Sequence, residues 1–173
     1  MLVELQDADV VLMVQAALRK ARQALVLVEP GTPAGFERIR MARTAIIGLG
    51  ARLVAPCPHG HACPIVAPDW CHFSVRLPRS RDHRLTKQAE RSFEDEKFSY
   101  LAVSRTLVPA LSGPRIISPP HIGKAEVTLR VCDQPGIAER RIPRQDKLNY
   151  KAPKKLGWGD VVRNTEEQTP VQS

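Results

Sequence analysis

The stretch Ala24-Leu-Val-Leu-Val-Glu-Pro-Gly-Thr-Pro-Ala-Gly35 carries the signals that decide the fold. Its first six residues form a continuous apolar run of strand length that ends at Glu29, a pattern typical of a parallel strand buried on both faces. Thr32 is a good N-cap and Pro33 suits the first position of a helix, so we predict that a helix begins there. A buried strand followed at once by a helix is the repeating unit of an α/β sheet.

The flanking sequence continues this alternation of helix and strand. Residues 7–22 carry apolar side chains at helical spacing, and residues 52–55 have the composition of a short strand. The helix after Pro33 should turn one apolar face inward, made of Phe36, Ile39, Ala42, Ile46 and Ile47. We therefore predict that residues 1–55 belong to a Rossmann-like, doubly wound α/β core.

The regular pattern stops at residues 56–68, which contain four prolines, two cysteines and two histidines without periodicity. A loop of this length needs something to order it. Residues 70–77 and 98–103 again resemble strands. We predict that residues 56–110 form a cysteine-rich insertion followed by a returning strand.

The last part of the chain is predicted to be rich in β structure. Apolar and polar residues alternate over 124–132, a turn sequence occupies 133–136, and 137–142 can return as a partner strand. This gives a small β-rich part over residues 111–162. Residues 163–173 are predicted to be a disordered tail, because their end lacks apolar periodicity.

The net charge of +8 is concentrated in the second half of the chain. Residues 72–163 carry 19 basic and 10 acidic side chains, whereas residues 1–71 carry 7 and 6. Such a bias favours a polyanionic partner, most plausibly nucleic acid. The alternative is a basic surface that serves only solubility.

The N-terminus and the hydropathy give expectations about location. The first nine residues contain three acidic and no basic side chains, so neither a secretory signal nor a mitochondrial presequence is expected. No apolar run approaches the roughly 18 residues that cross a bilayer, and we expect no membrane contact. The predicted location is a reducing bacterial cytoplasm.

In that compartment, clustered cysteines are more often metal ligands than disulfides. The chain has four: Cys57, Cys63, Cys71 and Cys132. Four thiolates suit a zinc ion or an iron–sulfur cluster. Zinc sites usually carry a short C-x2-4-C pair, which is absent, so an iron–sulfur cluster is favoured and zinc is the alternative. Three neighbouring histidines could replace one cysteine: His59, His61 and His72.

The surroundings of the four thiols can also be predicted from the sequence. The four cysteines could be unrelated buried thiols, but buried structural cysteines normally lie within regular elements. By strand alternation, Cys132 should point away from Val127 and Leu129 and could then reach the loop. Trp70 and Phe73 are expected to pack around the metal centre and to limit solvent access.

Several motifs resemble one known family. They are Leu25-Val-Leu-Val-Glu-Pro-Gly-Thr-Pro-Ala-Gly35, Ala55-Pro-Cys-Pro-His-Gly-His-Ala-Cys-Pro64, Asp69-Trp-Cys-His-Phe-Ser74, Glu94-Asp-Glu-Lys-Phe-Ser-Tyr-Leu101 and Tyr150-Lys-Ala-Pro-Lys-Lys155. Over roughly residues 1–160 the chain resembles the methyltransferase-like assembly factors of the mitochondrial small ribosomal subunit and their bacterial relatives, the Rsm-twenty-two type.

The resemblance implies a class I methyltransferase fold with a cysteine-rich insertion and a small β-rich C-terminal part. It implies a 4Fe-4S cluster whose ligands are Cys57, Cys63, Cys71 and Cys132. It also implies a role in maturation of the small ribosomal subunit, close to its rRNA, which agrees with the basic second half.

The chain departs from the family at its front. No glycine-rich loop for S-adenosylmethionine follows a strand, and the chain looks like the C-terminal half of a longer protein. Glu29, Pro30 and Gly31 would then end the fifth strand at the rim of the cofactor pocket. S-adenosylmethionine would bind only if an N-terminal half were supplied, for example by a separate chain, so enzymatic activity stays open.

Three functions follow from these observations. The first is a non-catalytic, cluster-containing module that binds rRNA; the second is an rRNA methyltransferase completed by an N-terminal partner; the third is a zinc-binding nucleic-acid module. The candidate RNA-binding residues are Arg79, Arg81, Arg84, Lys147, Lys151, Lys154 and Lys155, with Tyr150 and Trp158 as rings on which bases could stack.

Overall fold

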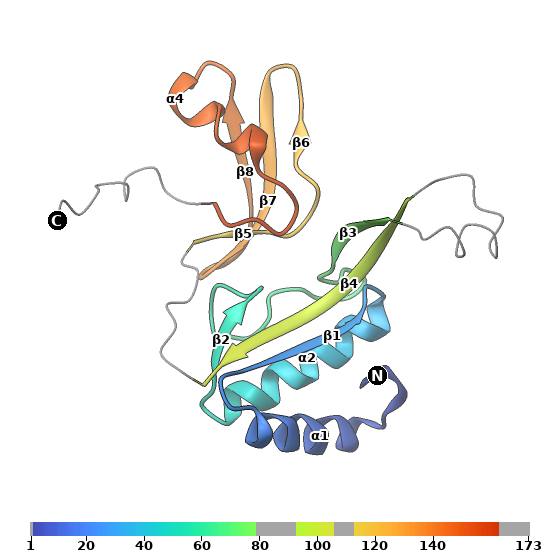
Figure 1. The fold of residues 1–173 in the computed structure, drawn as a ribbon. Helices are drawn as coiled ribbons and strands as arrows, with labels where there is room; N and C mark the ends of the chain where they lie inside the picture. Colours follow the sequence, from blue (N-terminus) through green and yellow to red (C-terminus); the bar gives the residue numbers. More distant parts are fainter. Residues whose placement is uncertain (1, 79–92, 106–112, 163–173) are drawn as a thin grey trace.

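The structure is a computed structural model that describes residues 2–78, 93–105 and 113–162. It contains two four-stranded antiparallel sheets, one formed by β1 to β4 and the other by β5 to β8 (Figure 1). None of the described helices is long and apolar enough to cross a membrane. The predicted disordered tail, residues 163–173, lies outside the described residues, and the predicted domain boundaries stay predictions.

The first sheet and its helices occupy the N-terminal part of the chain. In order, the elements are η1 (Leu2–Glu4), α1 (Asp7–Lys20), β1 (Ala24–Pro30), α2 (Pro33–Gly48), β2 (Arg52–Ala55), β3 (Phe73–Pro78) and β4 (Phe93–Ser104). Both predicted helices and the predicted strands β1 and β2 are therefore present. The predicted start of α2 is confirmed, because the Thr32 side chain accepts a hydrogen bond from the Gly35 amide at 3.1 Å and Pro33 follows it.

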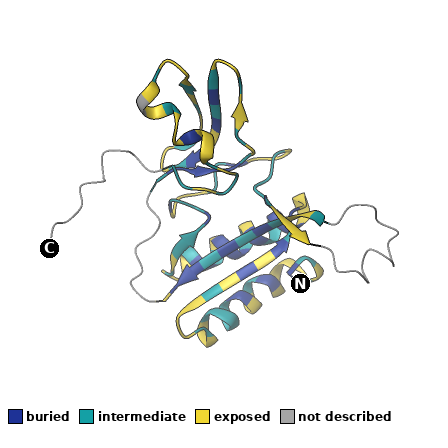
Figure 2. Cartoon of the chain, turned by 45° about the horizontal axis from the view of Figure 1, so that its top comes forward, coloured by how far each residue is buried: buried dark blue, intermediate teal, exposed yellow. Residues whose placement is uncertain are grey.

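The expected parallel strand buried on both faces is wrong for β1. The strand pairs antiparallel with β4, and its side chains alternate between buried and exposed (Figure 2). Val26 and Val28 are 59% and 56% exposed, whereas Leu27 and Glu29 are buried. Helices α1 and α2 cover only the face that carries Leu27, so an apolar run does not here mean two covered faces (Figure 1).

The order of the strands nevertheless retains an α/β feature. Strand β4 lies between β1 and β2 and runs antiparallel to both, so β1 and β2 run in the same direction. Helix α2 connects these two strands, as the crossover of a βαβ unit does. The observed fold is thus a mixed α/β arrangement with antiparallel pairing.

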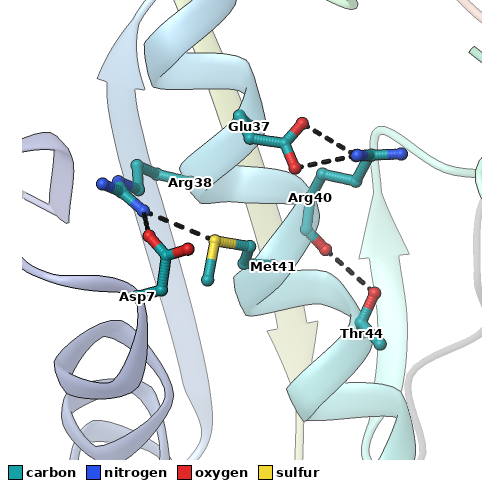
Figure 3. A network of polar contacts seen from close by, with 6 residues as sticks. All are labelled: Asp7, Glu37, Arg38, Arg40, Met41 and Thr44. Atoms are coloured by element: carbon teal, nitrogen blue, oxygen red, sulfur yellow. Dashed lines mark hydrogen bonds and ion pairs between the residues drawn. The ribbon is translucent and has the colours of Figure 1, made fainter. Parts of the chain in front are cut away.

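One apolar cluster joins α1, α2 and the first sheet. Its buried members include Val10 and Val14 of α1, Ile46 of α2, and Leu101 and Val103 of β4. At one end of the helix pair, polar contacts add to this packing (Figure 3). Arg38 of α2 forms an ion pair with Asp7 of α1, and the same guanidinium lies 3.5 Å from the sulfur of Met41.

The second sheet is built around one long hairpin. Its elements are β5 (Arg115–Ile116), β6 (His121–Ile122), β7 (Glu126–Asp133) and β8 (Gly136–Pro143), followed by the short helices α4 (Lys147–Tyr150) and η2 (Pro153–Lys155). The predicted turn is confirmed, because Asp133 pairs with Gly136, which has a positive φ of 131°. Val127, Leu129 and Val131 are buried with Ile116 in a second apolar cluster.

Candidate metal centre

The loop of residues 56–72 lies where the first sheet has a gap in its strand pairing. Strand β2 pairs with β4 at 102–104, and β3 pairs on the same side at 93–98. The intervening β4 residues 99–101 are therefore not paired on that side. The Ser99 hydroxyl donates a hydrogen bond to the Cys71 carbonyl at 2.8 Å, which fixes the end of the loop against β4.

The four cysteine side chains line one cavity between α2, β4, the loop and the second sheet. All four are free thiols; Cys132 is buried and the other three are partly buried. Cys132 packs in a cluster with Phe36, Ile65 and Ile117, while Val127 and Leu129 belong to the other cluster. Its predicted orientation, away from Val127 and toward the loop, is confirmed.

We call the cluster around Cys132 the junction cluster, because it connects the two sheets through the loop. Its buried members come from α2, the loop, the chain after β5, and β7, with four partly buried neighbours; the members are Phe36, Ile65, Ile117, Cys132, Cys63, Trp70, Cys71 and Ile137. The structure thus gathers thiols that are up to 75 positions apart in the chain, from Cys57 to Cys132.

Burial makes these thiols weak acids. Loss of hydration raises the pKa of Cys57, and the neighbouring Arg43 only partly opposes this shift. Burial and the other cysteines raise the pKa of Cys71 well above its usual range and the pKa of Cys132 to about 12. Without a metal these three thiols are protonated at neutral pH, so a metal must displace protons when it binds.

The thiols share a cavity without forming a ready-made site for one ion. Among the described residues, no three Cys, His, Asp or Glu side chains form a group that could hold a metal ion. Four sulfurs around one zinc ion, each about 2.3 Å from it, would lie only about 3.8 Å apart.

Two buried arginines hold the loop in place. Arg43 of α2 is 4% exposed and donates hydrogen bonds to the Cys57 sulfur at 3.3 Å, the His59 carbonyl at 2.9 Å and the His61 carbonyl at 2.6 Å. Arg115 of β5 is 6% exposed and donates to the Pro56 carbonyl at 2.9 Å. Both guanidinium groups line the cavity of the thiols.

Sequence reasoning missed these arginines. Arg43 lies four residues after Ile39 and three before Ile46, so it falls on the inward face of an amphipathic helix. A basic residue on that face needs a buried partner, and this was a readable signal. No such signal marked Arg115.

The histidines differ in their environments. His59 is buried; its Nε2 lies 3.7 Å from the Cys132 sulfur, and its Nδ1 has no hydrogen-bond partner. Burial, and then the nearby Arg43, lower the pKa of His59, so its ring is neutral. His61 is exposed, and His72 stacks on Trp70 with ring centroids 5.1 Å apart. Of the three, His59 is the one beside a thiol.

Aromatic rings cover the site on one side. Trp70 packs against the junction cluster and donates from its ring nitrogen to the Gly31 carbonyl at 3.0 Å. Phe73 is buried and lines the cavity. Trp158, predicted as an RNA-stacking ring, lies instead in this aromatic group, 4.8 Å from His72 and 6.4 Å from Phe73 between ring centroids. Its ring is used in packing.

The residues predicted at the rim of a cofactor pocket have structural contacts. Glu29 is buried, and its carboxylate accepts hydrogen bonds from the amides of Leu2 at 2.5 Å and Val3 at 3.3 Å. A Cβ at Gly31 would lie 2.7 Å from atoms of Lys97, so this position requires glycine. Pro30 ends β1 beside them. Their role at a pocket rim stays a prediction.

The predicted RNA-binding residues fall into two groups. Lys147 on α4, Lys151 just after it, and Lys154 and Lys155 on η2 are all exposed. No ion pair engages them within residues 113–162. The Lys154 ammonium lies 5.5 Å from the centre of the Tyr150 ring. Arg79, Arg81 and Arg84 lie outside the described residues.

Comparison with known proteins identifies the family. The sequence profile described as mitochondrial small ribosomal subunit Rsm22 matches residues 1–163. Two Rsm22-cox11 tandem proteins, 1 and 2, from Schizosaccharomyces pombe are each 30% identical over 180 residues, covering 79% of this chain and 24% of the relative. The human ribosome assembly protein METTL17 is 29% identical over 168 residues, covering 90% of this chain and 36% of the relative.

The names of these relatives correct one prediction. All three are named as mitochondrial proteins, so the expectation of a bacterial cytoplasmic protein is wrong. That expectation came from residues 1–9, and such residues are uninformative about targeting in a chain that spans only 24% or 36% of its relatives' length. Because the profile match extends over nearly the whole sequence, the chain belongs to the Rsm22 family of the mitochondrial small ribosomal subunit.

Proposed function

We propose that Cys57, Cys63, Cys71 and Cys132 hold a 4Fe-4S cluster, and that the chain acts in assembly of the small ribosomal subunit by binding its rRNA. The observation that carries the proposal is the single cavity lined by four free thiols, three from one loop and one from β7. The names of the relatives supply the process and a mitochondrial location.

The chemistry of the donor set supports a cluster more than zinc. Thiolates are the usual ligands of iron–sulfur clusters, and the surrounding shell of Phe73, Trp70 and Ile65 limits access of water. When bound, the cluster would supply four strong bonds to otherwise separate segments and a redox-active centre.

The cluster would have a structural consequence for the interface between the sheets. Cys57, Cys63 and Cys71 belong to the loop, and Cys132 belongs to the second sheet. Ligands that meet only in the folded protein convert metal-binding energy into folding energy. The cluster would therefore fix the basic second sheet relative to the α/β core, which presents its lysines to RNA in one orientation.

An anaerobic purification tests the metal centre. The purified chain should be brown, with a broad absorption band near about 400 nm and about four irons and four sulfides per chain. One zinc per chain and no colour would support the alternative, a zinc-binding nucleic-acid module. A chain without metal after anaerobic reconstitution with iron and sulfide would contradict both.

The RNA-binding part of the proposal rests on the exposed lysines after β8. Lys147, Lys151, Lys154 and Lys155 lie within nine residues of one another and are exposed, on a segment whose Tyr150 and Leu156 pack against the apolar cluster of the second sheet. Lysines contact phosphates as point charges, so the binding should weaken steeply with salt.

A triple variant, Lys151→Ala with Lys154→Ala and Lys155→Ala, tests this surface on a small-subunit rRNA fragment. The slope of log affinity against log salt should fall by about 2, for three lost contacts to single-stranded RNA. The matched control replaces three cations at the end of α1, Arg19, Lys20 and Arg22, and should leave the slope unchanged. Equal slopes for all three proteins would exclude the lysine surface.

We propose as a second function that the first sheet is part of a larger, Rossmann-like methyltransferase sheet. In support, α2 links two strands that run in the same direction, and no described residue pairs with the outer edge of β1. Val26 and Val28 on the uncovered face of β1 are more than half exposed. An N-terminal segment could add a strand at the edge, cover this face and supply the loop that binds S-adenosylmethionine.

Co-expression tests this second function. The remainder of METTL17 outside its match to this chain, produced with this chain, should co-purify and bind S-adenosylmethionine in calorimetry. Neither part alone should bind it. Co-purification without any binding of S-adenosylmethionine would support a completed sheet and would exclude the methyltransferase function.

A further inference from the structure

Two buried guanidinium groups lie beside the thiols, and neither has a carboxylate partner in the part of the chain that the structure describes. Arg43 and Arg115 are 4% and 6% exposed. Within residues 2–78, 93–105 and 113–162, their hydrogen-bond acceptors are backbone carbonyls and the Cys57 sulfur, and no ion pair includes either arginine. Carbonyl oxygens satisfy N–H groups but carry no net charge, so no described residue compensates these two buried positive charges.

The carboxylates nearest to the site are already used. Asp69 of the loop forms an ion pair with Arg130, and Asp133 at the end of β7 forms one with Arg140. Burial of a charge is unfavourable unless an opposite charge accompanies it. The pair Arg43 and Arg115 therefore calls for an anionic group in the cavity that both of them line.

We infer that Arg43 and Arg115 balance the charge of the thiolate-bound group and set its reduction potential. This inference rests on the proposed metal centre. Four thiolates carry four negative charges, and an oxidised 4Fe-4S core carries two positive charges. The resulting net charge of two negative matches the two arginines. One-electron reduction adds a further negative charge, which the same arginines stabilise.

The two arginines act at different distances from sulfur. Arg43 donates from Nε to the Cys57 sulfur at 3.3 Å, and hydrogen bonds to ligand sulfurs raise the potential of iron–sulfur clusters. Arg115 reaches the Pro56 carbonyl at 2.9 Å and the Gly159 carbonyl at 2.7 Å, so it acts on the sulfurs through its charge. We expect the larger effect from Arg43. Both are positioning residues, because neither is a ligand.

The test compares Arg43→Gln, Arg115→Gln and the control Arg141→Gln in the cluster-loaded full chain. Arg141 is exposed on β8 and pairs with Glu139, so its loss changes the net charge by the same amount away from the thiols. The equilibrium constant for one-electron reduction should fall at least tenfold for Arg43→Gln, a shift of 59 mV to more negative potential. Iron loss to a chelator should be about tenfold faster.

A role of Arg43 in loop structure alone would change the rate of iron loss and leave the potential unchanged. Arg43→Lys separates charge from geometry, since it should keep most of the potential and lose part of the iron retention. Arg43→Met, which keeps side-chain volume, is the second variant if Arg43→Gln does not fold. Potentials of both arginine variants equal to that of Arg141→Gln would overturn the inference. A wild-type chain without a cluster would instead overturn the proposed function.

Discussion

The interior of each sheet and the junction between the sheets are built from different kinds of side chain. Leu101 and Val103 pack with the helices over the first sheet, and Val127 and Leu129 fill the second. These interiors are aliphatic. The junction cluster instead combines aromatic rings with cysteines, among them Cys71 and Cys132. Each sheet can therefore exclude water by itself, whereas their connection depends on thiols and buried arginines.

The two kinds of interior imply two sources of stability, one within each sheet and one at the junction. Aliphatic packing is present as soon as each sheet forms, because it needs no added group. The junction holds buried thiols and two guanidinium groups that no described carboxylate neutralises, so the proposed anionic cluster would stabilise it. Removal of the metal should thus loosen the junction and leave both sheet interiors intact.

The largest effect is expected from Cys71→Ser. The variant loses one of four ligands and should retain little iron, and its free energy of unfolding should fall by about 4 kcal/mol, as for loss of a structural metal. Iron analysis and denaturant unfolding measure both. Ser74→Ala, three residues away, should change stability by less than about 0.5 kcal/mol. A Cys71→Ser chain with full iron content and unchanged stability would exclude the four-cysteine site.

A rise in pH should lower the stability of the metal-free chain and should raise its affinity for metal. Burial, with smaller contributions from Cys57 and Cys63, raises the pKa of Cys132 from its ordinary value of 9.0 to about 12. In the metal-free chain, this stabilisation is complete below the unfolded pKa and is lost as pH rises toward 12. Metal binding displaces the thiol protons, so metal affinity should increase with pH.

Thermal unfolding at several pH values and a titration of metal at pH 6 and pH 8 measure the two trends. In the metal-free chain, Cys132→Ala should flatten the alkaline loss of stability. Proton release on loading, followed with an indicator dye, should approach one proton for each protonated thiol that becomes a ligand. Metal affinity that is independent of pH would show that thiolates are not the ligands.

Two matched truncations test whether the interiors of the two sheets are coupled. Leu101→Ala and Leu129→Ala remove fully buried side chains from the first and second sheets, and each should destabilise the protein by about 3 kcal/mol. In the loaded protein, both should lower protection of amides in both sheets. In the metal-free protein, hydrogen exchange should show each loss confined to its own sheet. Loss of protection in both sheets without metal would mean that the junction cluster suffices to couple them.

Local patterns predicted the main helices and strands, but not the short elements β5, β6 and α4, and they predicted the pairing only in part. The N-cap at Thr32, the start of α2 and the hairpin of β7 and β8 depend on neighbouring residues, and such signals are readable from sequence. The antiparallel insertion of β4 between β1 and β2 depends on residues more than 40 positions away. Because Val26 and Val28 are apolar yet exposed, the run around them misled the burial prediction.

The sequence predicted which thiols come together, but not the side chains that surround them. The parity of β7 placed Cys132 on the face opposite Leu129, and the structure confirms this. The contacts of Arg43 and His59 were not predictable, because they depend on how the proline-rich loop folds back over α2. Regular elements can be read from periodicity, but such a loop has none.

A smaller effect is expected at the start of α2. Thr32→Ala removes the side chain that accepts from the Gly35 amide and should lower the free energy of unfolding by about 1 kcal/mol. Thr44→Ala is the matched control, because Thr44 is exposed in the same helix and donates only to the Arg40 carbonyl (Figure 3). It should be neutral or slightly stabilising, as alanine has the higher helix propensity. Equal losses in both variants would contradict a specific capping role.

The smallest effect is expected on the uncovered face of β1. Val26→Thr changes a side chain that is 59% exposed and should alter the free energy of unfolding by less than about 0.5 kcal/mol. Val103→Thr places the same hydroxyl on the buried face of the neighbouring strand and should be destabilising by about 2 kcal/mol. If the proposed N-terminal segment covers β1, its presence should make Val26→Thr as harmful as Val103→Thr. An equal loss in the isolated chain would mean that this face is already covered, for example by a second copy.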